Sequence, residues 1–208
     1  HAEAPGAPVA PQAWNFTVER ELAANLGLRV SYVGNKGTAI DRSTTNWNLP
    51  RSQTPGTIQS NRPYQPWGDI NALVFDGSSI THQLQVEVTQ RTRAGLTLQS
   101  TFTWNKSLDN VPASGITQNP YDTAADRGNA DGIRDRVWHT SLLYDLPFGP
   151  GKRFLTQNRP LRHLVGGWST GLFLVVASGS PLSVTFSPTA AGWYATRADV
   201  VSGVDTHP

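Results

Sequence analysis

Apolar side chains recur at every second position in this chain and hardly ever at the spacing of an α-helix. The clearest segments are residues 80–92 and 96–106, in which Leu84 and Val86 alternate with Gln83 and Gln85. Successive side chains of a β-strand point to opposite faces, so this period gives each strand one apolar and one polar face. The pattern predicts an all-β, antiparallel up-and-down meander.

The second face of the predicted strands is polar, whereas a packed soluble sandwich needs apolar layers that meet between two sheets. The strands are about ten residues long, and a tilted membrane strand needs about 9–11. An apolar outside with a polar inside is typical of a transmembrane β-barrel, so we expect an arc of such a barrel. The residues expected to line its lumen are Gln83, Gln85, Glu87, Gln99, Thr101 and Asn105.

Connection lengths alternate between short turns and long stretches rich in Gly, Pro, Asn and Ser. Residues 23–27 and 92–95 are short, while residues 39–79 and 107–135 are long, as in outer-membrane barrels. We expect residues 67–75 to be part of a raised hairpin within a long outer loop and not a separate crossing. The remaining strands, about seven crossings, are predicted at residues 14–22, 28–34, 80–92, 96–106, 136–146, 168–178 and 182–186.

Barrels made from one bacterial chain use an even number of strands, so we expect this chain to supply only part of a wall. The predicted organisation is an irregular leader at residues 1–12, a barrel segment at 13–187 and a loop or truncated end at 188–208. The chain contains no Met and begins at His1, which favours a processed or truncated piece.

Four tryptophans are placed where strands begin or end. Trp104 and Trp138 flank the long loop at 107–135, and Trp14 is expected at the same level. Trp168 is expected at the opposite level. Because an indole ring suits the boundary between lipid and water, we predict that these four residues mark the two membrane interfaces. The alternative is a soluble β-sandwich binding module that uses exposed tryptophans.

Composition excludes several other classes. Seventeen Lys and Arg against fifteen Asp and Glu leave a net charge of only +2, which disfavours nucleic-acid binding. The absence of Cys removes disulfides, thiolate catalysis and Cys-bound metals. The five histidines are scattered without metal-ligand spacing. We therefore expect no cofactor and no enzymatic activity.

Two local patterns keep chemical alternatives open. Residues 167–171 fit G-x-S-x-G, so a serine esterase would use Ser169 with Asp199 or Asp205 and His207. That reading needs a strand-to-helix turn, whereas a strand-like run follows Ser169. The second pattern is a set of oxygen ligands for calcium in a loop. Its members are Asp122, Asp126, Asn129, Asp131 and Asp135.

Several segments together resemble the barrel region of the Oar-like TonB-dependent outer-membrane receptors. They are WNFTVEREL at residues 14–22, SYVGNKG at 31–37, NRPY at 61–64, LQV at 84–86, TWNKSLD at 103–109, DRG at 126–128, LPFG at 146–149, GGW at 166–168 and SGSP at 178–181.

This resemblance implies a plugged barrel of about 22 strands in the bacterial outer membrane. Its partners would be outer-membrane lipid, an unknown bulky solute and the TonB system, reached through a plug region. The chain departs from the family in showing no plug, no TonB-contacting segment, no carboxypeptidase-like leading domain and no terminal aromatic residue. We therefore expect uptake only by an intact protein that contains this segment.

Overall fold

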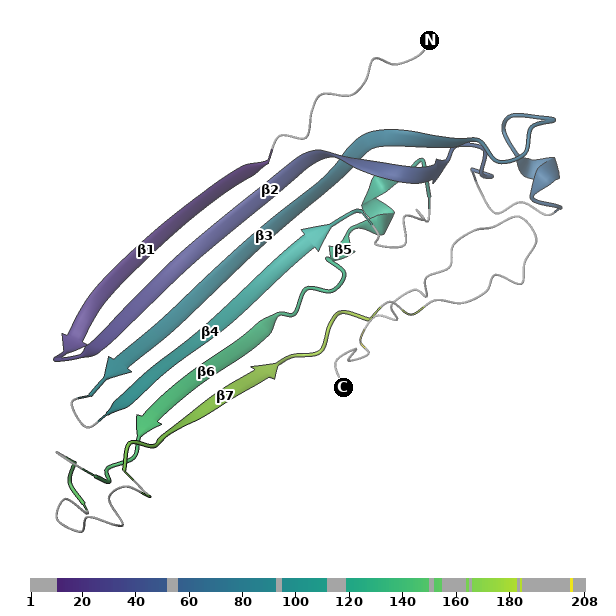
Figure 1. Cartoon of the computed structure of the whole chain (residues 1–208). Coiled ribbons are helices and arrows are strands. Elements are labelled where there is room, and N and C mark those ends of the chain that lie inside the picture. The colour runs from purple at the N-terminus through teal and green to yellow at the C-terminus, as the bar shows by residue number, and fades with distance from the viewer. Residues whose placement is uncertain are drawn as a thin grey trace.

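A single antiparallel sheet forms the body of the chain in a computed structural model (Figure 1). The structure describes residues 11–51, 56–92, 95–111, 119–149, 152–154, 164, 166–182, 184 and 203. The strands are β1 (Gln12–Ala23), β2 (Leu26–Asn46), β3 (Asn71–Arg91), β4 (Leu96–Asp109), β5 (Gly128–Asn129), β6 (Arg136–Asp145) and β7 (Ser169–Ala177). Two short 3₁₀ helices, η1 (Gln59–Asn61) and η2 (Thr123–Asp126), lie in the connections.

The strand order is β1-β2-β3-β4-β6-β7, with the short β5 paired to β4. Each long strand therefore lies beside its neighbour in sequence, and the predicted all-β antiparallel meander is confirmed. Six long strands are described. The strand predicted at 182–186 lies mostly outside the described residues, as do residues 1–10 and nearly all of 188–208.

The turns at one end of the sheet are short. β1 and β2 are joined through Asn25, whose φ of 67° is in the left-handed region that Asn accepts more readily than most residues. At the next turn Gly95 has a φ of 86°, and its N–H donates to the Thr92 carbonyl at 3.2 Å. β3 ends at Arg91 and β4 begins at Leu96, so this turn lies where the sequence predicted it.

The opposite end of the sheet carries a raised hairpin. β2 and β3 each contain 21 residues and extend past the other strands (Figure 1). Their far halves pair through Arg42 with Val74 and Asn46 with Asn71, after register shifts that begin at Thr38. The prediction that residues 67–75 are part of a raised hairpin agrees with this arrangement for residues 71–75, which begin its returning strand. Residues 71–75 continue the same strand as Ile80 because bulges let the pairing resume, and residues 67–70 belong to the connection.

The described residues form one layer, with no second sheet packed on either face. Among them, the buried apolar side chains are Leu49 (5% exposed), Ala130 (7%), Pro50 and Pro120. All four lie in the long connections rather than in the sheet. None of the helices in the described part of the chain is long and apolar enough to cross a membrane.

Candidate functional site

One face of the sheet, called the apolar face here, carries the even-numbered side chains of the regularly paired strands. Cross-strand pairing aligns them in rows, because residues directly opposite each other point the same way. One row runs across the whole sheet through Val18, Val30, Val86, Phe102, Trp138 and Val176. Phe16 is 68% exposed and Phe102 is 42% exposed, although both are large aromatic residues on this face. Their exposure indicates that this surface is covered by something other than the described chain.

The other face, called the polar face here, carries the side chains predicted to line a lumen. Gln83 pairs with Asn105, Glu87 pairs with Thr101, and Gln85 lies between them on β3. Gln99 is on the same face, two residues from Thr101 on β4. The structure therefore brings all six predicted residues together on one surface, where Gln99 is exposed and the other five are partly exposed.

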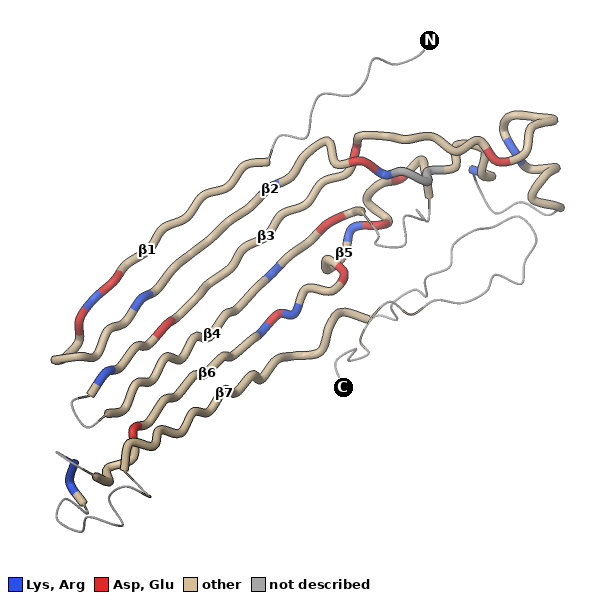
Figure 2. Tube along the Cα trace, in the orientation of Figure 1, with Lys and Arg blue, Asp and Glu red and all other residues tan. Residues whose placement is uncertain are grey.

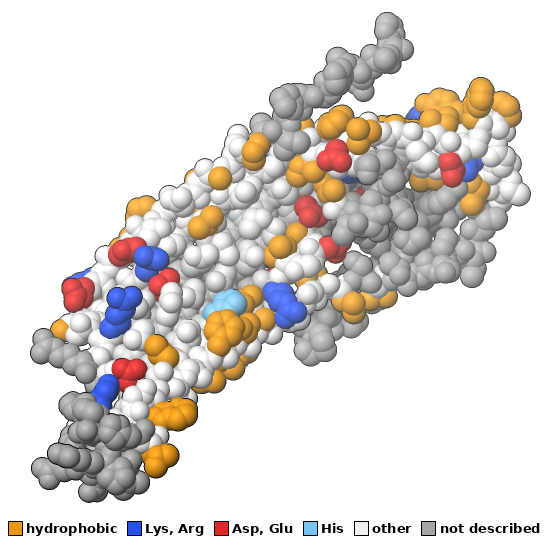
Figure 3. All heavy atoms as spheres, viewed as in Figure 1, with side chains coloured by type: hydrophobic (Ala, Val, Ile, Leu, Met, Phe, Trp, Pro, Cys, Tyr) orange, Lys and Arg blue, Asp and Glu red, His pale blue; other side chains and the backbone are white. Residues whose placement is uncertain are grey.

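A charged network crosses the polar face near the short turns. Arg29 Nε donates to Glu19 Oε1 at 2.5 Å, and Arg29 Nη1 lies 3.5 Å from Glu87 Oε2. Gln99 extends the network by donating to Glu87 Oε1 at 3.2 Å. Figure 3 shows red and blue side chains gathered over this end of β1, β2 and β3. Such a set of ionised groups is compatible with water and costly in hydrocarbon.

The middle of the sheet contains no Asp, Glu, Lys or Arg. The uncharged stretches are 12–18 in β1, 30–35 in β2, 77–86 in β3, 96–105 in β4, 137–144 in β6 and all of β7. Figure 2 shows this as a tan band between coloured segments at the two ends. The stretches in β3 and β4 match the length of about 9–11 residues that a tilted strand needs to cross a bilayer.

The predicted interface tryptophans lie on the apolar face along a diagonal. Trp14 is opposite Gly34, Trp104 is opposite Arg136, and Trp138 is opposite Phe102. Trp104 and Trp138 are therefore offset by two residues along the strands, whereas the sequence interpretation placed them at one level. A diagonal of this kind follows from the tilt of barrel strands against the membrane normal.

Trp168 lies at the short-turn end, where its carbonyl accepts from Leu146 N–H at 2.8 Å and its indole N–H donates to Leu164 O at 2.9 Å. The structure therefore places it at the opposite end of the sheet from the other three.

Polar groups on the apolar face are paired with one another. The Trp138 indole N–H donates to Ser100 Oγ at 2.7 Å, and Ser100 Oγ lies 3.0 Å from Thr140 Oγ1. The Tyr32 hydroxyl is 2.7 Å from His82 Nδ1, and the two rings are stacked. Internal pairing of this kind lowers the cost of removing hydroxyl and imidazole groups from water.

The sequence interpretation missed an apolar patch on the polar face of β6 and β7. Leu143, Phe173 and Val175 point to this side, and Phe173 is 69% exposed. His139 lies beside them, with its ring 6.4 Å from that of Phe173. The continuous apolar run from Leu172 to Ala177 was the available signal, because a strand without alternation is apolar on both faces.

The sequence also gave little indication of the ordered outer connections. Asn48 is fully buried. Its side-chain oxygen accepts from Tyr64 N–H at 2.9 Å. Its side-chain nitrogen lies 2.6–2.9 Å from the carbonyl oxygens of Tyr64, Trp67 and Gly68. Arg42 is also buried and makes a two-pronged contact of 2.6 Å with Asp76. The Tyr121 hydroxyl donates to the Trp47 carbonyl at 2.6 Å and so joins the two long connections.

The calcium hypothesis is not supported by the positions of its ligands. Asp122 accepts from Ala124 N–H, Asn129 accepts from Lys106 Nζ at 2.6 Å, and Asp126 is buried 3.9 Å from Arg42. In the described ranges, no group of three or more His, Asp or Glu side chains converges on one point.

The esterase and sandwich alternatives are corrected by the fold. Ser169 is the first residue of a regular strand and pairs with Asp145, so it does not occupy a strand-to-helix turn. Asp199, Asp205 and His207 lie outside the described residues. The sandwich alternative fails because no second layer covers the apolar face among the residues that the structure describes.

Comparison with known proteins gives one match. A family model described as an outer membrane beta barrel domain matches residues 8–208. A comparison with curated proteins and another with solved structures found no match.

Proposed function

The chain belongs to the outer membrane beta-barrel domain family and is an outer-membrane protein, and from this premise we propose that it forms part of the wall of a TonB-dependent receptor. The apolar face then contacts lipid, and the polar face lines the interior of the barrel. Further strands of the full-length protein complete the wall, since the described sheet ends in β1 on one side and β7 on the other. Unpaired strand edges in lipid would cost several kcal/mol for each backbone group.

The observation that carries the lipid-facing assignment is the exposure of the apolar face. Phe16, Phe102, Trp104 and Leu172 are all exposed on it, while the interior of the described chain contains almost no aliphatic side chains. Burying apolar surface contributes roughly 25 cal/mol per Å². A sheet with this face in water would forgo that stabilisation, whereas a bilayer supplies it.

The interior assignment accounts for the polar face. Gln83, Gln85, Gln99, Thr101 and Asn105 keep polar groups toward a watery lumen, and Glu87 is held there by Arg29. A solute passing through the barrel would meet these side chains. Interface roles for Trp14, Trp104, Trp138 and Trp168 belong to the same proposal, because their rings lie near the ends of the uncharged band.

TonB dependence rests on the ordered sequence segments that resemble the Oar-like receptors. It is tested by crosslinking in living cells between the full-length protein and TonB, with the 208-residue chain alone as the negative control. We expect an adduct with the full-length protein only. An absent adduct, together with free passage of small ions through the purified protein, would show an open pore and contradict a receptor that needs TonB.

A further inference from the structure

Acidic side chains of the regularly paired strands lie on one face of the sheet only, whereas basic side chains lie on both faces. In the regularly paired part of the sheet, which ends at Thr38 on β2, the charged residues on the apolar face are all basic. They are Arg20, Lys36, Lys106 and Arg136. The acidic side chains of the same paired strands are on the polar face: Glu19, Glu21, Glu87, Asp109 and Asp145. A surface intended only for hydrocarbon has no need of cations, so their placement calls for an anionic neighbour.

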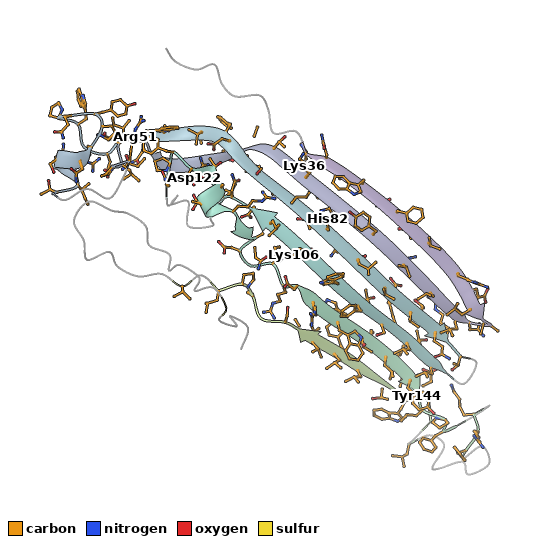
Figure 4. All side chains as sticks on the ribbon, turned by 180° about the vertical axis from the view of Figure 1, so that it is seen from behind. Lys36, Arg51, His82, Lys106, Asp122 and Tyr144 are labelled. Carbon is orange, nitrogen blue, oxygen red and sulfur yellow. The ribbon has the colours of Figure 1, made fainter. Side chains whose placement is uncertain are left out.

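Three of these cations form a continuous band with His82 at the long-loop end, called the basic band here. His82 is directly opposite Lys106. Lys36 is opposite Ile80, which is two residues from His82 on β3. Arg136 is opposite Trp104, which is two residues from Lys106 on β4. Figure 4 shows Lys36, His82 and Lys106 on the neighbouring strands β2, β3 and β4. Diagonal neighbours across strands lie about 7–8 Å apart, so the band is within reach of one or two headgroups.

The basic band runs alongside the diagonal of Trp14, Trp104 and Trp138, on the side of that diagonal nearer the long loops. Lys106 is two residues from Trp104 on the same strand, and Arg136 is two residues from Trp138. Lys36 is opposite Gln12, two residues from Trp14. Aromatic rings settle at the boundary between hydrocarbon and headgroups, and long basic side chains extend from there to the charged layer. The basic band therefore lies at the level of lipid phosphates.

The band also lacks internal neutralisation. Arg29, Arg42, Arg62 and Lys152 each lie within 4.0 Å of a carboxylate. In the described part of the chain no carboxylate forms such a pair with Lys36, Lys106 or Arg136, and all three side chains are exposed. Lys106 donates to Asn129 at 2.6 Å, which leaves two of its three N–H donors for another group.

We propose that the basic band binds the anionic phosphate groups of lipid headgroups in the leaflet next to the long loops. Arg136 can engage a phosphate through two N–H donors, and the two lysines add compact positive charge. The acyl chains of the same lipid would lie on the neighbouring apolar face. This inference rests on the proposed contact of that face with lipid.

The test is a titration of the detergent-solubilised full-length protein with phosphatidylglycerol or phosphatidylcholine, with bound lipids counted by native mass spectrometry. The variant combines Lys36→Gln, Lys106→Gln and Arg136→Gln. Arg20→Gln on the same face at the short-turn end is the matched control. A third variant, with Lys36→Arg and Lys106→Arg and with Arg136 unchanged, keeps the charges and shows whether substitution at these two lysines by itself disturbs binding.

We expect tighter binding of phosphatidylglycerol than of phosphatidylcholine, and at least a tenfold loss in the glutamine variant, since each cation near an anionic surface contributes roughly fivefold. The control and the charge-keeping variant should bind as the unmodified protein does. Equal binding by the glutamine variant would overturn the proposal, and so would complete displacement of the lipid by inorganic phosphate, which would indicate a site for the free ion. Retained binding of both lipids without a preference would refute the headgroup role while leaving the lipid-facing assignment intact.

Discussion

The indole ring of Trp14 covers the Cα of Gly34, its cross-strand partner in β2. A Cβ added at Gly34 would overlap the ring atoms of Trp14. His82 lies on the other side of Gly34, with its ring 6.4 Å from that of Trp14 and edge-on to it. The glycine thus provides the space in which the first tryptophan of the diagonal lies flat on the sheet.

Gly34→Val should displace the Trp14 ring and lower the free energy of unfolding by about 1–3 kcal/mol, the usual cost of overpacking. The measurement is equilibrium unfolding of the full-length protein in lipid vesicles, followed by tryptophan fluorescence. Gly27→Ala on the same strand is the control, since its added Cβ meets nothing closer than 4.0 Å. Combining Gly34→Val with Trp14→Ala should recover part of the loss. An additive double variant would contradict the packing.

Adjacent residues of β3 should respond oppositely to a new charge. Val86→Arg places a cation on the apolar face within the uncharged band and should cost about 2–4 kcal/mol, as for arginine at the bilayer midplane. Gln85→Arg places the same cation on the polar face and should change stability much less. Equilibrium unfolding of the two variants in lipid vesicles measures both changes in the free energy of unfolding. Similar losses for the two variants would argue against a watery interior on the polar side.

Asn48 should hold the raised connection together without stabilising the sheet. Asn48→Ala leaves the Tyr64 N–H and three carbonyls without their buried partner, at a cost of about 1–3 kcal/mol for an unpaired group. Hydrogen exchange should accelerate at the Tyr64 amide while the amides of β4 and β6 keep their protection. The exposed Asn35→Ala on β2 serves as the control. Unchanged exchange at Tyr64 would show that Asn48 does not order the connection.

The same connection should loosen in acid. Asp69 lies 2.5 Å from Arg62 and accepts from Asn46 at 2.9 Å, and these two groups hold the pKa of the Asp69 carboxyl below its usual range. Because the folded pKa is lower than the unfolded one, the stabilisation is present above the ordinary Asp pKa of about 3.9 and is lost as the pH falls through the folded value. Tryptophan fluorescence or hydrogen exchange across 47–70 measures this change. Asp69→Asn should remove the acid dependence, and an unchanged profile in that variant would assign it to another group.

The two faces and the short turns were predictable from sequence, because side-chain alternation and turn residues are local properties. Leu84, Val86 and Phe102 share a face for the simple reason that strands have a period of two. The same rule predicted that Gln83, Gln85, Glu87, Gln99, Thr101 and Asn105 share the other face. Gly95 ends the second short turn because it accepts a positive φ.

The register of the raised hairpin and the order within the outer connections were not predictable in this way. Pairing resumes between Arg42 and Val74 only after bulges that break the alternation, so the period-two signal is lost there. Asn48 lies in a stretch that reads as an ordinary loop, and its partners are 16 to 20 residues away. The offset between Trp104 and Trp138 depends on register, which the length of a long loop does not determine.

The most direct measurement is a scan of single spin labels along β4 of the full-length protein in lipid vesicles. Each residue from 98 to 103 is replaced in turn by Cys, which the chain otherwise lacks. The account predicts that labels at Leu98, Ser100 and Phe102 collide preferentially with oxygen dissolved in lipid, while labels at Gln99, Thr101 and Thr103 do not. Oxygen collisions without alternation, or stronger at the odd positions, would contradict the assignment of the apolar face to lipid.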